Sequence, residues 1–254
     1  MRRTKDYLET RESQILDMIN TRRSVSVQEV ADAFHISPST VRKQISALSD
    51  RGLLVKTYGG ASANPVLSET STIRHLEEKQ RVARLARKQI HDDEVILIGA
   101  GSTTNILASL LHDANRLTVV TNSVIVAAET MKNPHIDTRI CGGIVRSKTG
   151  GVFGMQAVKF LEEVHGDKVF ISPDSISVEY GVGDFNAMVS FSQQAMIHSA
   201  RELYILADAT KIGLTTYSDR IAGLDQVSCL ITNTEAPVDQ LNEFRKIGLK
   251  VLLA

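Results

Sequence analysis

The stretch that decides the fold is SVQEVADAFHISPSTVRKQISALSD, residues 26–50, because it carries the start signals of two consecutive helices. Ser26 and Glu29 have the S-x-x-E spacing of a capping box, which predicts that a helix begins there. Ser37 then offers an N-cap, and Pro38 occupies the first helical position; both residue types are favoured at these places. The stretch therefore predicts two short helices joined by a tight turn.

Apolar residues around this stretch recur at helical spacing and predict the core of a three-helix head. They are Ile15, Met18, Ile19, Val27, Val30, Ala31, Phe34, Val41, Ile45 and Leu48. The opposite face of the last helix carries hydroxyl and basic side chains, which reach phosphates and base edges in the major groove of DNA. These are Ser39, Thr40, Arg42, Lys43 and Ser46.

A hairpin is expected directly after these helices. Residues 53–57 read as a strand, and Gly59 and Gly60 supply a turn. Such a hairpin would be the wing of a winged helix-turn-helix, beside the DNA backbone. A small helical bundle with a solvated basic face is the ordinary alternative, and the caps, the turn and the polar face together favour DNA binding.

The sign of the net charge changes between the predicted head and the rest of the chain. Residues 1–60 hold ten Lys and Arg against seven Asp and Glu, a net charge of +3, and the remainder holds 19 against 22, a net charge of −3. A basic head on an acidic body favours the head, rather than the body, as the part that meets phosphates such as those of double-stranded DNA. The expected DNA contacts are Arg22, Arg23, Ser37, Ser39, Thr40, Arg42, Lys43, Lys56, Thr57 and Tyr58.

The rest of the chain alternates strand and helix patterns. Strands are predicted at residues 94–98, 117–121, 137–141, 168–172, 202–207, 228–232 and 250–254. Helices are predicted near residues 77–90, 104–111, 123–131, 155–164, 191–200 and 238–247. This alternation favours an α/β domain with a mostly parallel sheet that helices cover on both faces. The predicted organisation is a winged helix-turn-helix domain at 1–60, a linker at 61–75 and the α/β domain at 76–254.

Composition excludes several classes of protein. No apolar run approaches the length of a membrane span, and the charged start lacks the apolar region of a signal peptide, so a cytoplasmic protein without membrane contact is expected. Cys141 and Cys229 lie in apolar surroundings and are predicted to be buried free thiols. The spacing of Cys and His residues predicts no metal site.

Polar residues follow most of the predicted strands. In parallel sheets, ligands sit at the carboxyl ends of strands, so these residues predict one site for a small, anionic, polyhydroxylated ligand. Each group taken alone is better explained as a helix cap or a turn, and only their convergence on one edge of the sheet favours a ligand site. The groups are Gly101, Ser102, Thr103 and Thr104; Thr121, Asn122 and Ser123; Gly142, Gly143 and Arg146; Asp174; and Asp208 with Lys211.

The glycine loop GAGSTT, residues 99–104, raises the possibility of a dinucleotide site. That fingerprint requires a third glycine where Thr104 stands, and an acidic residue about 20 positions further on. The next predicted strand ends at Thr121, Asn122 and Ser123, without a carboxylate. NAD is therefore rejected, and no cofactor is expected.

Residues 24–61, SVSVQEVADAFHISPSTVRKQISALSDRGLLVKTYGGA, resemble the DNA-binding head of the DeoR family of bacterial sugar-metabolism repressors. The resemblance covers nearly the whole chain. Its body resembles the sensor domain of that family, which is similar in fold to ribose-5-phosphate isomerase. The resemblance implies a repressor whose operator binding is controlled by a phosphorylated sugar or polyol.

The resemblance also implies roles for individual residues. Hydroxyls and amides of residues 102–104 would hold a phosphate, Arg146 and Lys211 would neutralise its charge, and Asn122 and Asp174 would bind sugar hydroxyls. Lys79 belongs to a Glu-Lys pair that recurs where the domain begins. The implied effector-binding set is Lys79, Gly101, Ser102, Thr103, Thr104, Thr121, Asn122, Ser123, Gly142, Gly143, Arg146, Asp174, Asp208 and Lys211.

The chain departs from the family pattern at three places. Gly99 stands where an aspartate is common, Ser175 replaces a glycine within SPDSIS, and AMVSF at 187–191 replaces the usual acidic residues. The departures touch the sugar end of the implied site rather than the phosphate end. They leave open whether the response to an effector is weakened.

Three functions remain open from the sequence. The first is a transcriptional repressor, the second an isomerase-like enzyme using Asp174, Asp208 or Lys211 in proton transfer, and the third a scaffold with a degenerate pocket. A winged helix favours the repressor, and no catalytic residue is expected. Because one head makes few DNA contacts, a dimer or larger homo-oligomer is predicted.

Overall fold

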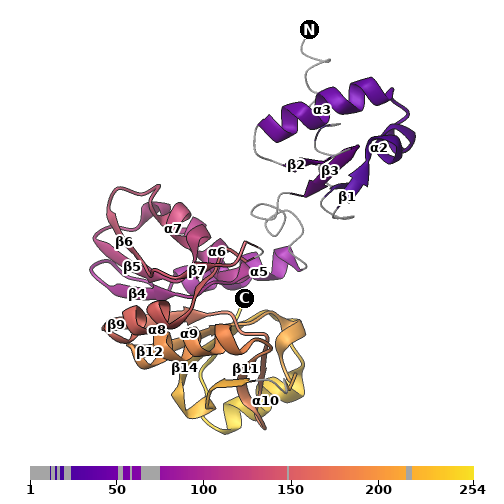
Figure 1. The fold of residues 1–254 in the computed structure, drawn as a ribbon. Helices are drawn as coiled ribbons and strands as arrows, with labels where there is room; N and C mark the ends of the chain where they lie inside the picture. The colour runs from indigo at the N-terminus through magenta and orange to yellow at the C-terminus, as the bar shows by residue number, and fades with distance from the viewer. Residues whose placement is uncertain are drawn as a thin grey trace. The chain divides into compact units, whose positions relative to one another are not determined.

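The structure is a computed structural model of the 254-residue chain. It describes residues 12, 15, 18, 19, 24–50, 54–57, 59–63, 75–147, 149–215 and 219–254. The chain forms two compact units, Met1–Arg74 and His75–Ala254 (Figure 1). Each unit buries a hydrophobic core of its own.

The first unit combines helices with a three-stranded antiparallel sheet of order β1-β3-β2. Its elements are β1 Ser24–Ser26, α2 Val27–Phe34, α3 Pro38–Asp50, β2 Leu54–Thr57 and β3 Gly60–Ala63. The predicted helix pair and the wing are confirmed. Strand β1 was not expected, and β3 extends three residues beyond position 60, where the head was predicted to end.

The helix boundaries in this unit follow the predicted capping residues. Ser26 Oγ accepts a hydrogen bond from Glu29 N at 3.1 Å, and Ser26 N donates to Glu29 Oε2 at 2.7 Å, which is a complete capping box. His35 ends α2 in the left-handed region at φ 50°. At the start of α3, Thr40 N donates to Ser37 Oγ at 3.2 Å.

The core of the first unit packs helices α2 and α3 against the strands of the wing. Ile15, Ile19, Ile45 and Leu48 are at most 1 % exposed and belong to the same cluster. Strand β3 approaches β1 so closely that a Cβ atom at Gly60 would lie 2.0 Å from the carbonyl oxygen of Val25. Glycine is therefore required where the wing meets β1.

The second unit is built on a seven-stranded sheet of order β15-β14-β12-β9-β4-β5-β6. Every pairing between neighbours is parallel. All seven predicted strands are present, with ends shifted by at most two residues. They are β4 Val95–Ile98, β5 Leu117–Thr121, β6 Ile136–Ile140, β9 Gly166–Ile171, β12 Ala200–Leu206, β14 Val227–Thr232 and β15 Val251–Leu253.

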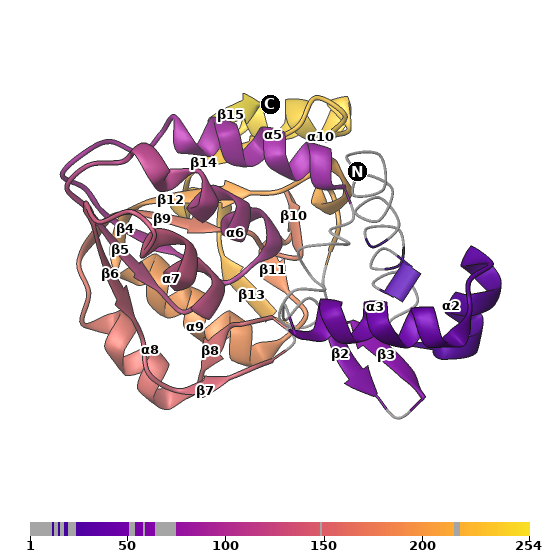
Figure 2. The same ribbon diagram turned by 90° about the horizontal axis from the view of Figure 1, so that it is seen from above.

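Helices cover both faces of this sheet, as predicted (Figure 2). Helices α5, α6 and α7 share one core with Ile96 and Ile98 of β4. Helices α8, α9 and α10 share the opposite core with Leu97 of β4 and Ile205 of β12. Their bounds are α5 Leu76–Arg87, α6 Ser102–Ser109, α7 Val124–Thr130, α8 Met155–Glu162, α9 Ala187–His198 and α10 Val238–Lys246.

Several short elements were not predicted. Strands β7 Ile144–Val145 and β8 Val152–Phe153 form a hairpin. Strands β10 Ser175–Ser177, β11 Gly181–Asp184 and β13 Asp219–Ala222 form a second, antiparallel sheet. The 3-10 helices are η1 Leu111–Asp113, η2 Ala209–Lys211 and η3 Leu224–Gln226.

Candidate functional site

Hydroxyl groups gather at the start of α3. Ser37 Oγ lies 2.8 Å from both Ser39 Oγ and Thr40 Oγ1. Ser37 and Ser39 are exposed, and Thr40 is partly buried. Because a helix N-terminus attracts anions, this end of α3 is suited to a DNA phosphate or a base edge.

Basic side chains continue this surface. Arg42 and Lys43 are exposed on α3, and Lys56 and Thr57 are exposed on β2 of the wing. A recognition helix beside a wing is the arrangement in which winged helices place side chains on DNA. Three further predicted contacts, Arg22, Arg23 and Tyr58, lie outside the described residues.

A second candidate site lies at the carboxyl edge of the seven-stranded sheet. Strands β4 and β9 are neighbours, although the chain runs outward from β4 to β6 in one direction and from β9 to β15 in the other. Ligands of open α/β sheets bind at such a reversal of strand order. The segments that follow β4, β9 and β12 meet there, namely residues 99–104, 172–174 and 207–211.

The segment after β4 leads directly into α6. Gly101 is the N-cap residue, where a Cβ atom would lie 3.1 Å from Thr104 Oγ1 and 3.3 Å from Ser172 Cβ. Thr103 and Thr104 are fully buried, whereas Gly101 and Ser102 are partly exposed. A ligand would therefore meet Ser102 and the first-turn amides of α6, which have no partner within the helix.

The segment Thr121, Asn122 and Ser123 holds this glycine loop in place. Asn122 is 1 % exposed, and its Oδ1 accepts a hydrogen bond from Ala100 N at 2.9 Å. Thr121 Oγ1 donates to Ile98 O at 2.6 Å, and Ser123 caps α7. Residues 121–123 therefore position the glycine loop through hydrogen bonds to the backbone of Ile98 and Ala100.

The β7–β8 hairpin places Arg146 beside the start of α9. Gly143 has φ +148°, and a Cβ atom there would lie 2.5 Å from Phe153 O, so the two strands meet closely. The Arg146 guanidinium lies 5.7 Å from the centroid of the Phe153 ring, and its Nη2 lies 3.4 Å from Met188 Sδ. Gly142 and Arg146 are both exposed.

Lys211 connects the ends of three strands. Its Nζ donates to Pro173 O at 2.5 Å and to Ser172 Oγ at 3.1 Å. Ser172 Oγ in turn lies 3.4 Å from Thr103 Oγ1 in α6. Burial lowers the pKa of Lys211, and the nearby carboxylate of Asp208 opposes that shift. An anion at this place would favour the charged form of the lysine.

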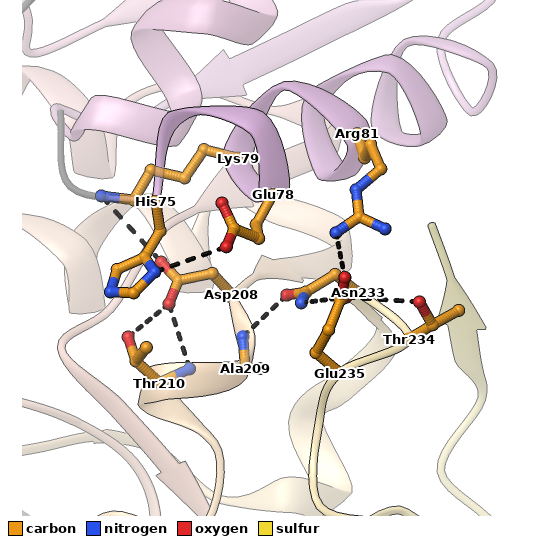
Figure 3. A network of polar contacts seen from close by, with 10 residues as sticks. All are labelled: His75, Glu78, Lys79, Arg81, Asp208, Ala209, Thr210, Asn233, Thr234 and Glu235. Carbon is orange, nitrogen blue, oxygen red and sulfur yellow. Dashed lines mark hydrogen bonds and ion pairs between the residues drawn. The ribbon is translucent and has the colours of Figure 1, made fainter.

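A ring of polar contacts joins α5 to the turn that carries Asp208 (Figure 3). Lys79 Nζ lies 4.0 Å from Asp208 Oδ2, and Asp208 Oδ1 accepts from Thr210 N at 3.1 Å. Ala209 N donates to Asn233 Oδ1 at 2.7 Å. Asp208 is only 2 % exposed, so its carboxylate positions the turn.

The ring closes through the segment after β14. Asn233 Nδ2 donates to Glu235 Oε2 at 2.6 Å, and Arg81 Nη2 of α5 donates to Glu235 Oε1 at 2.5 Å (Figure 3). The hydrogen bonds from Asn233 and Arg81 hold the pKa of Glu235 well below its usual range. His75, which precedes α5, lies 3.5 Å from Glu78 Oε1. Sequence reasoning found Lys79 and Asp208 but not this ring.

Two carboxyl groups lie close together beyond β9. Asp174 is partly buried, and its Oδ2 accepts from Phe185 N at 3.1 Å. Asp184 is 6 % exposed; burial and the charge of Asp174 raise the pKa of Asp184 to about 6. Sequence reasoning missed Asp184, which is a single polar residue without a motif, and it assigned no role to Ser172, the first residue of SPDSIS.

A separate apolar cavity of about 460 Å³ lies between α8 and α9. Its lining includes Met155, Val158, Met188 and Phe191. Met155 is 70 % exposed and Phe191 is 61 % exposed. Exposed apolar surface of this kind is typical of a contact surface for another molecule.

Other predicted features concern metals, thiols and membranes. Within the described ranges, no group of three or more His, Cys, Asp or Glu residues could hold a metal ion. Cys141 and Cys229 are free and buried, as predicted. Among the helices that the structure describes, none is long and apolar enough to cross a bilayer.

The fold and the two sites define a class of protein, a two-domain transcriptional regulator with a winged helix-turn-helix and an α/β sensor. Two family models match the chain: DeoR-like helix-turn-helix domain over residues 11–65 and DeoR C terminal sensor domain over residues 74–234. The chain belongs to the DeoR family of transcriptional regulators.

Relatives in this family match along most of the chain. HTH-type transcriptional regulator GolR of Listeria innocua is 28% identical over 96% of this chain and 98% of its own length. HTH-type transcriptional regulator IolR of Bacillus subtilis is 31% identical over 83% of this chain and 85% of its own length. The glycerol-3-phosphate regulon repressor of Escherichia coli is 25% identical over 90% of this chain and 92% of its own length. These relatives favour the regulator over the isomerase-like enzyme.

Solved structures show only a distant likeness. Ribose 5-phosphate isomerase A of Methanocaldococcus jannaschii has a TM-score of 0.41 at 19% identity, over 54% of this chain and 55% of the isomerase. A translation initiation factor eIF-2B of Pyrococcus horikoshii has a TM-score of 0.43 at 16% identity, over 64% of this chain and 65% of the factor. Neither likeness carries an argument about ligand or activity.

Proposed function

We propose that this protein is the repressor of an operon for sugar or polyol use, and that a phosphorylated sugar or polyol controls its binding to operator DNA. The observation that carries the proposal is the meeting of the α6 start, Ser172 and Lys211 at the reversal of strand order. Two relatives support it by name: the glycerol-3-phosphate regulon repressor, and a putative aga operon transcriptional repressor of Escherichia coli O157:H7 that is 25% identical over 96% of this chain and 93% of its own length.

DNA binding falls to the first unit in this proposal. The exposed Arg42 and Lys43 of α3 read base edges, and the hydroxyls of Ser37, Ser39 and Thr40 bind phosphates. The remaining contacts come from Lys56, Thr57, Arg22, Arg23 and Tyr58. Residues 61–75 link this unit to the sensor at 76–254.

The phosphate of the effector binds at the start of α6 in this proposal. Gly101 and Ser102 are accessible, and the ammonium of Lys211 is connected to the same helix through Ser172. A phosphate there gains helix amides, a hydroxyl and a cation, which is the chemistry of known anion sites. Asp174 binds sugar hydroxyls, and Arg146 adds charge. The positioning residues are Lys79, Thr103, Thr104, Thr121, Asn122, Ser123, Gly142, Gly143 and Asp208.

Assembly into a dimer or larger homo-oligomer completes the proposal. A single winged helix makes few specific contacts, so useful operator affinity requires more than one. The exposed apolar side chains of α8 and α9, among them Met155 and Phe191, are surface available for such an assembly. The protein would act on operator DNA in the cytoplasm.

A paired binding experiment tests this function. Thermal shift of the full chain is measured with phosphorylated sugars and polyols and with their unphosphorylated partners, since a ligand of the native state raises the melting temperature. We expect stabilisation by a phosphorylated compound alone, and the same compound should alter binding to operator DNA. Equal stabilisation by the unphosphorylated partner would contradict the phosphate site.

A further inference from the structure

Helices α8 and α9 lie side by side on one face of the main sheet and run in the same direction (Figure 1). At their starts, the Arg146 guanidinium lies 5.7 Å from the centroid of the Phe153 ring, just before α8, and its Nη2 lies 3.4 Å from Met188 Sδ in α9. At their ends, Ser199 Oγ donates to Leu161 O at 2.7 Å, which joins the C-cap of α9 to the last turn of α8. Two parallel helices therefore bound the apolar cavity between α8 and α9.

The middle of this cavity is apolar, and nothing in the part of the chain that the structure describes covers it. Met155 is 70 % exposed, Phe191 is 61 % exposed and Met188 is 38 % exposed, and all three line the cavity. A pocket for a small molecule encloses most of its ligand, whereas these side chains stand open to solvent. Aromatic and methionine side chains are enriched at the core of protein–protein interfaces, where charged residues are depleted. The cavity is therefore better suited to the surface of another protein.

Charges of opposite sign lie at the two ends of this cavity. Arg146 lies beside the starts of α8 and α9, and the first turn of neither helix carries an acidic residue. Glu162 and His198 line the cavity at the last turns of the two helices, and the exposed Glu163 follows directly. Lys159 lies one turn earlier in α8, outside the lining. A carboxylate at the end of α8 gains nothing from the dipole of its own helix, but it would be stabilised beside the start of another.

We infer that a second copy of this chain covers the cavity, with α8 and α9 of the two copies antiparallel about a two-fold axis. The inference rests on the proposed function and deepens it, because it assigns the surface through which the homo-oligomer forms. A two-fold axis brings the same surface of both copies together, so that surface must be complementary to itself. In the antiparallel arrangement Arg146 of each copy faces Glu162 of the other at the rim, and the apolar side chains around Phe191 are buried between them.

Sedimentation equilibrium of the full chain, whose mass is 27.8 kDa, tests the inference without effector or DNA. We expect the unmodified chain to form dimers or multiples of dimers at micromolar concentration. Phe191→Glu should raise the dissociation constant of the dimer by about thirtyfold or more, because it places a charge in the apolar middle of the interface. Val238→Glu is the matched control, since Val238 of α10 is 67 % exposed and lies outside the cavity. The control should assemble as the unmodified chain does.

Charge reversal tests the antiparallel arrangement. Arg146→Glu alone and Glu162→Arg alone should each raise the dissociation constant of the dimer by about tenfold or more, because like charges then face each other across the interface. The double variant should recover most of the lost affinity, since opposite charges meet again. Recovery in the double variant would also show that neither substitution acts by unfolding the chain. The measurement excludes effector because Arg146 also belongs to the proposed effector-binding set.

The outcomes separate the inference from the function on which it rests. An unmodified chain that sediments as a monomer, or a Phe191→Glu chain that assembles like the control, would leave the cavity to a different protein or to a small apolar molecule, and the inference would be wrong. A double variant that assembles no better than the single variants would overturn the antiparallel pairing and the inference with it. If assembly behaves as expected while no phosphorylated compound stabilises the chain, the proposed effector control fails and the interface remains.

Discussion

A buried lysine, Lys168, and a partly buried lysine, Lys211, lie in the same α/β unit and have different partners. Lys168 of β9 is 6 % exposed, and its Nζ donates to Glu94 Oε1 at 2.5 Å and to Gln89 O at 2.6 Å. A carboxylate and a carbonyl therefore satisfy it at the amino edge of the sheet. Lys211, at the carboxyl edge, donates to a neutral hydroxyl and a neutral carbonyl. Within the part of the chain that the structure describes, no carboxylate lies equally close to its charge, which suits Lys211 to an anionic ligand.

The contrast leads to a prediction for Lys211→Met and Lys168→Met. The first should lower the affinity for the effector by about tenfold or more and leave operator binding unchanged, because a charge-assisted hydrogen bond is lost at the ligand. The second should lower the melting temperature, because it leaves the partly buried carboxylate of Glu94 without its cationic partner. Calorimetry with the effector and fluorescence anisotropy with operator DNA measure the first. A Lys211→Met repressor that is still released by the effector would remove this residue from the site.

The carboxyl of Asp184 predicts a pH dependence of stability. Its pKa of about 6 in the folded chain lies above the ordinary value of 3.8, so the folded state holds this proton more tightly between these values. The contribution of this group to the free energy of unfolding therefore falls as the pH rises from about 4 to about 6, by at most about 3 kcal/mol. Asp184→Asn should remove that contribution. Urea unfolding of both proteins across this range measures it, and parallel pH profiles would contradict the prediction.

Among the elements, α3 is the helix that we propose to contact the bases of DNA. Its apolar residues Val41, Ile45 and Leu48 are buried in the head, so the exposed Arg42 has no part in the core. Arg42→Ala should therefore weaken operator binding by about 1–3 kcal/mol without affecting effector binding. Anisotropy titration against operator and unrelated DNA measures the loss. Arg84→Ala, at an exposed position of α5, is the control, and equal losses in both variants would contradict a specific role for Arg42.

The wing depends on its close approach to β1. A Cβ atom at Gly60 would lie 2.0 Å from Val25 O, closer than any relaxed side chain allows. Gly60→Ala should therefore destabilise the first unit by more than about 1 kcal/mol and weaken operator binding. Gly142→Ala is the matched control, because a Cβ atom there meets nothing within 4 Å. Thermal unfolding by circular dichroism compares them, and equal melting temperatures would contradict the prediction.

The central strands β4, β5, β9 and β14 could be predicted because they are mostly apolar runs buried on both faces, and the edge strands β6 and β15, which are more exposed, followed from the alternation of strand and helix patterns. Strands β7, β8, β10 and β11 could not, since they are two to four residues long and β11 reads GVGD. At the candidate effector site, too, only residues within a recognisable sequence pattern could be predicted. Motif residues such as Gly101 and Lys211 were found from the chain, whereas Ser172 and Asn233 enter the site only through tertiary contacts.

In the whole molecule, two cores of unequal size predict two melting events. The described core of the first unit holds far fewer buried apolar side chains than the two cores that flank the sheet of the second. Small domains bury a smaller share of their surface and are correspondingly marginal. We expect the first unit to unfold at the lower temperature.

Differential scanning calorimetry of the full chain measures this behaviour. An effector at about 100 times its Kd should stabilise the second unit by about 2.7 kcal/mol, and therefore raise the upper transition by about 5–10 °C. The lower transition should move less. A single transition that shifts as a whole would show instead that the two units unfold together.

The ring that fastens α5 to the Asp208 turn has a consequence for building chimeric biosensors from this family. Lys79 and Arg81 of α5 bind partners after β12 and β14, so this helix belongs structurally to the sensor, although it is the first helix after the head that the structure describes. A fusion could join a foreign DNA-binding head together with the helix that follows it in its own protein. Such a fusion would replace α5, and Asp208 and Glu235 would lose their partners Lys79 and Arg81. The junction of such a hybrid belongs ahead of His75, so that the helix is inherited with the sheet that holds it.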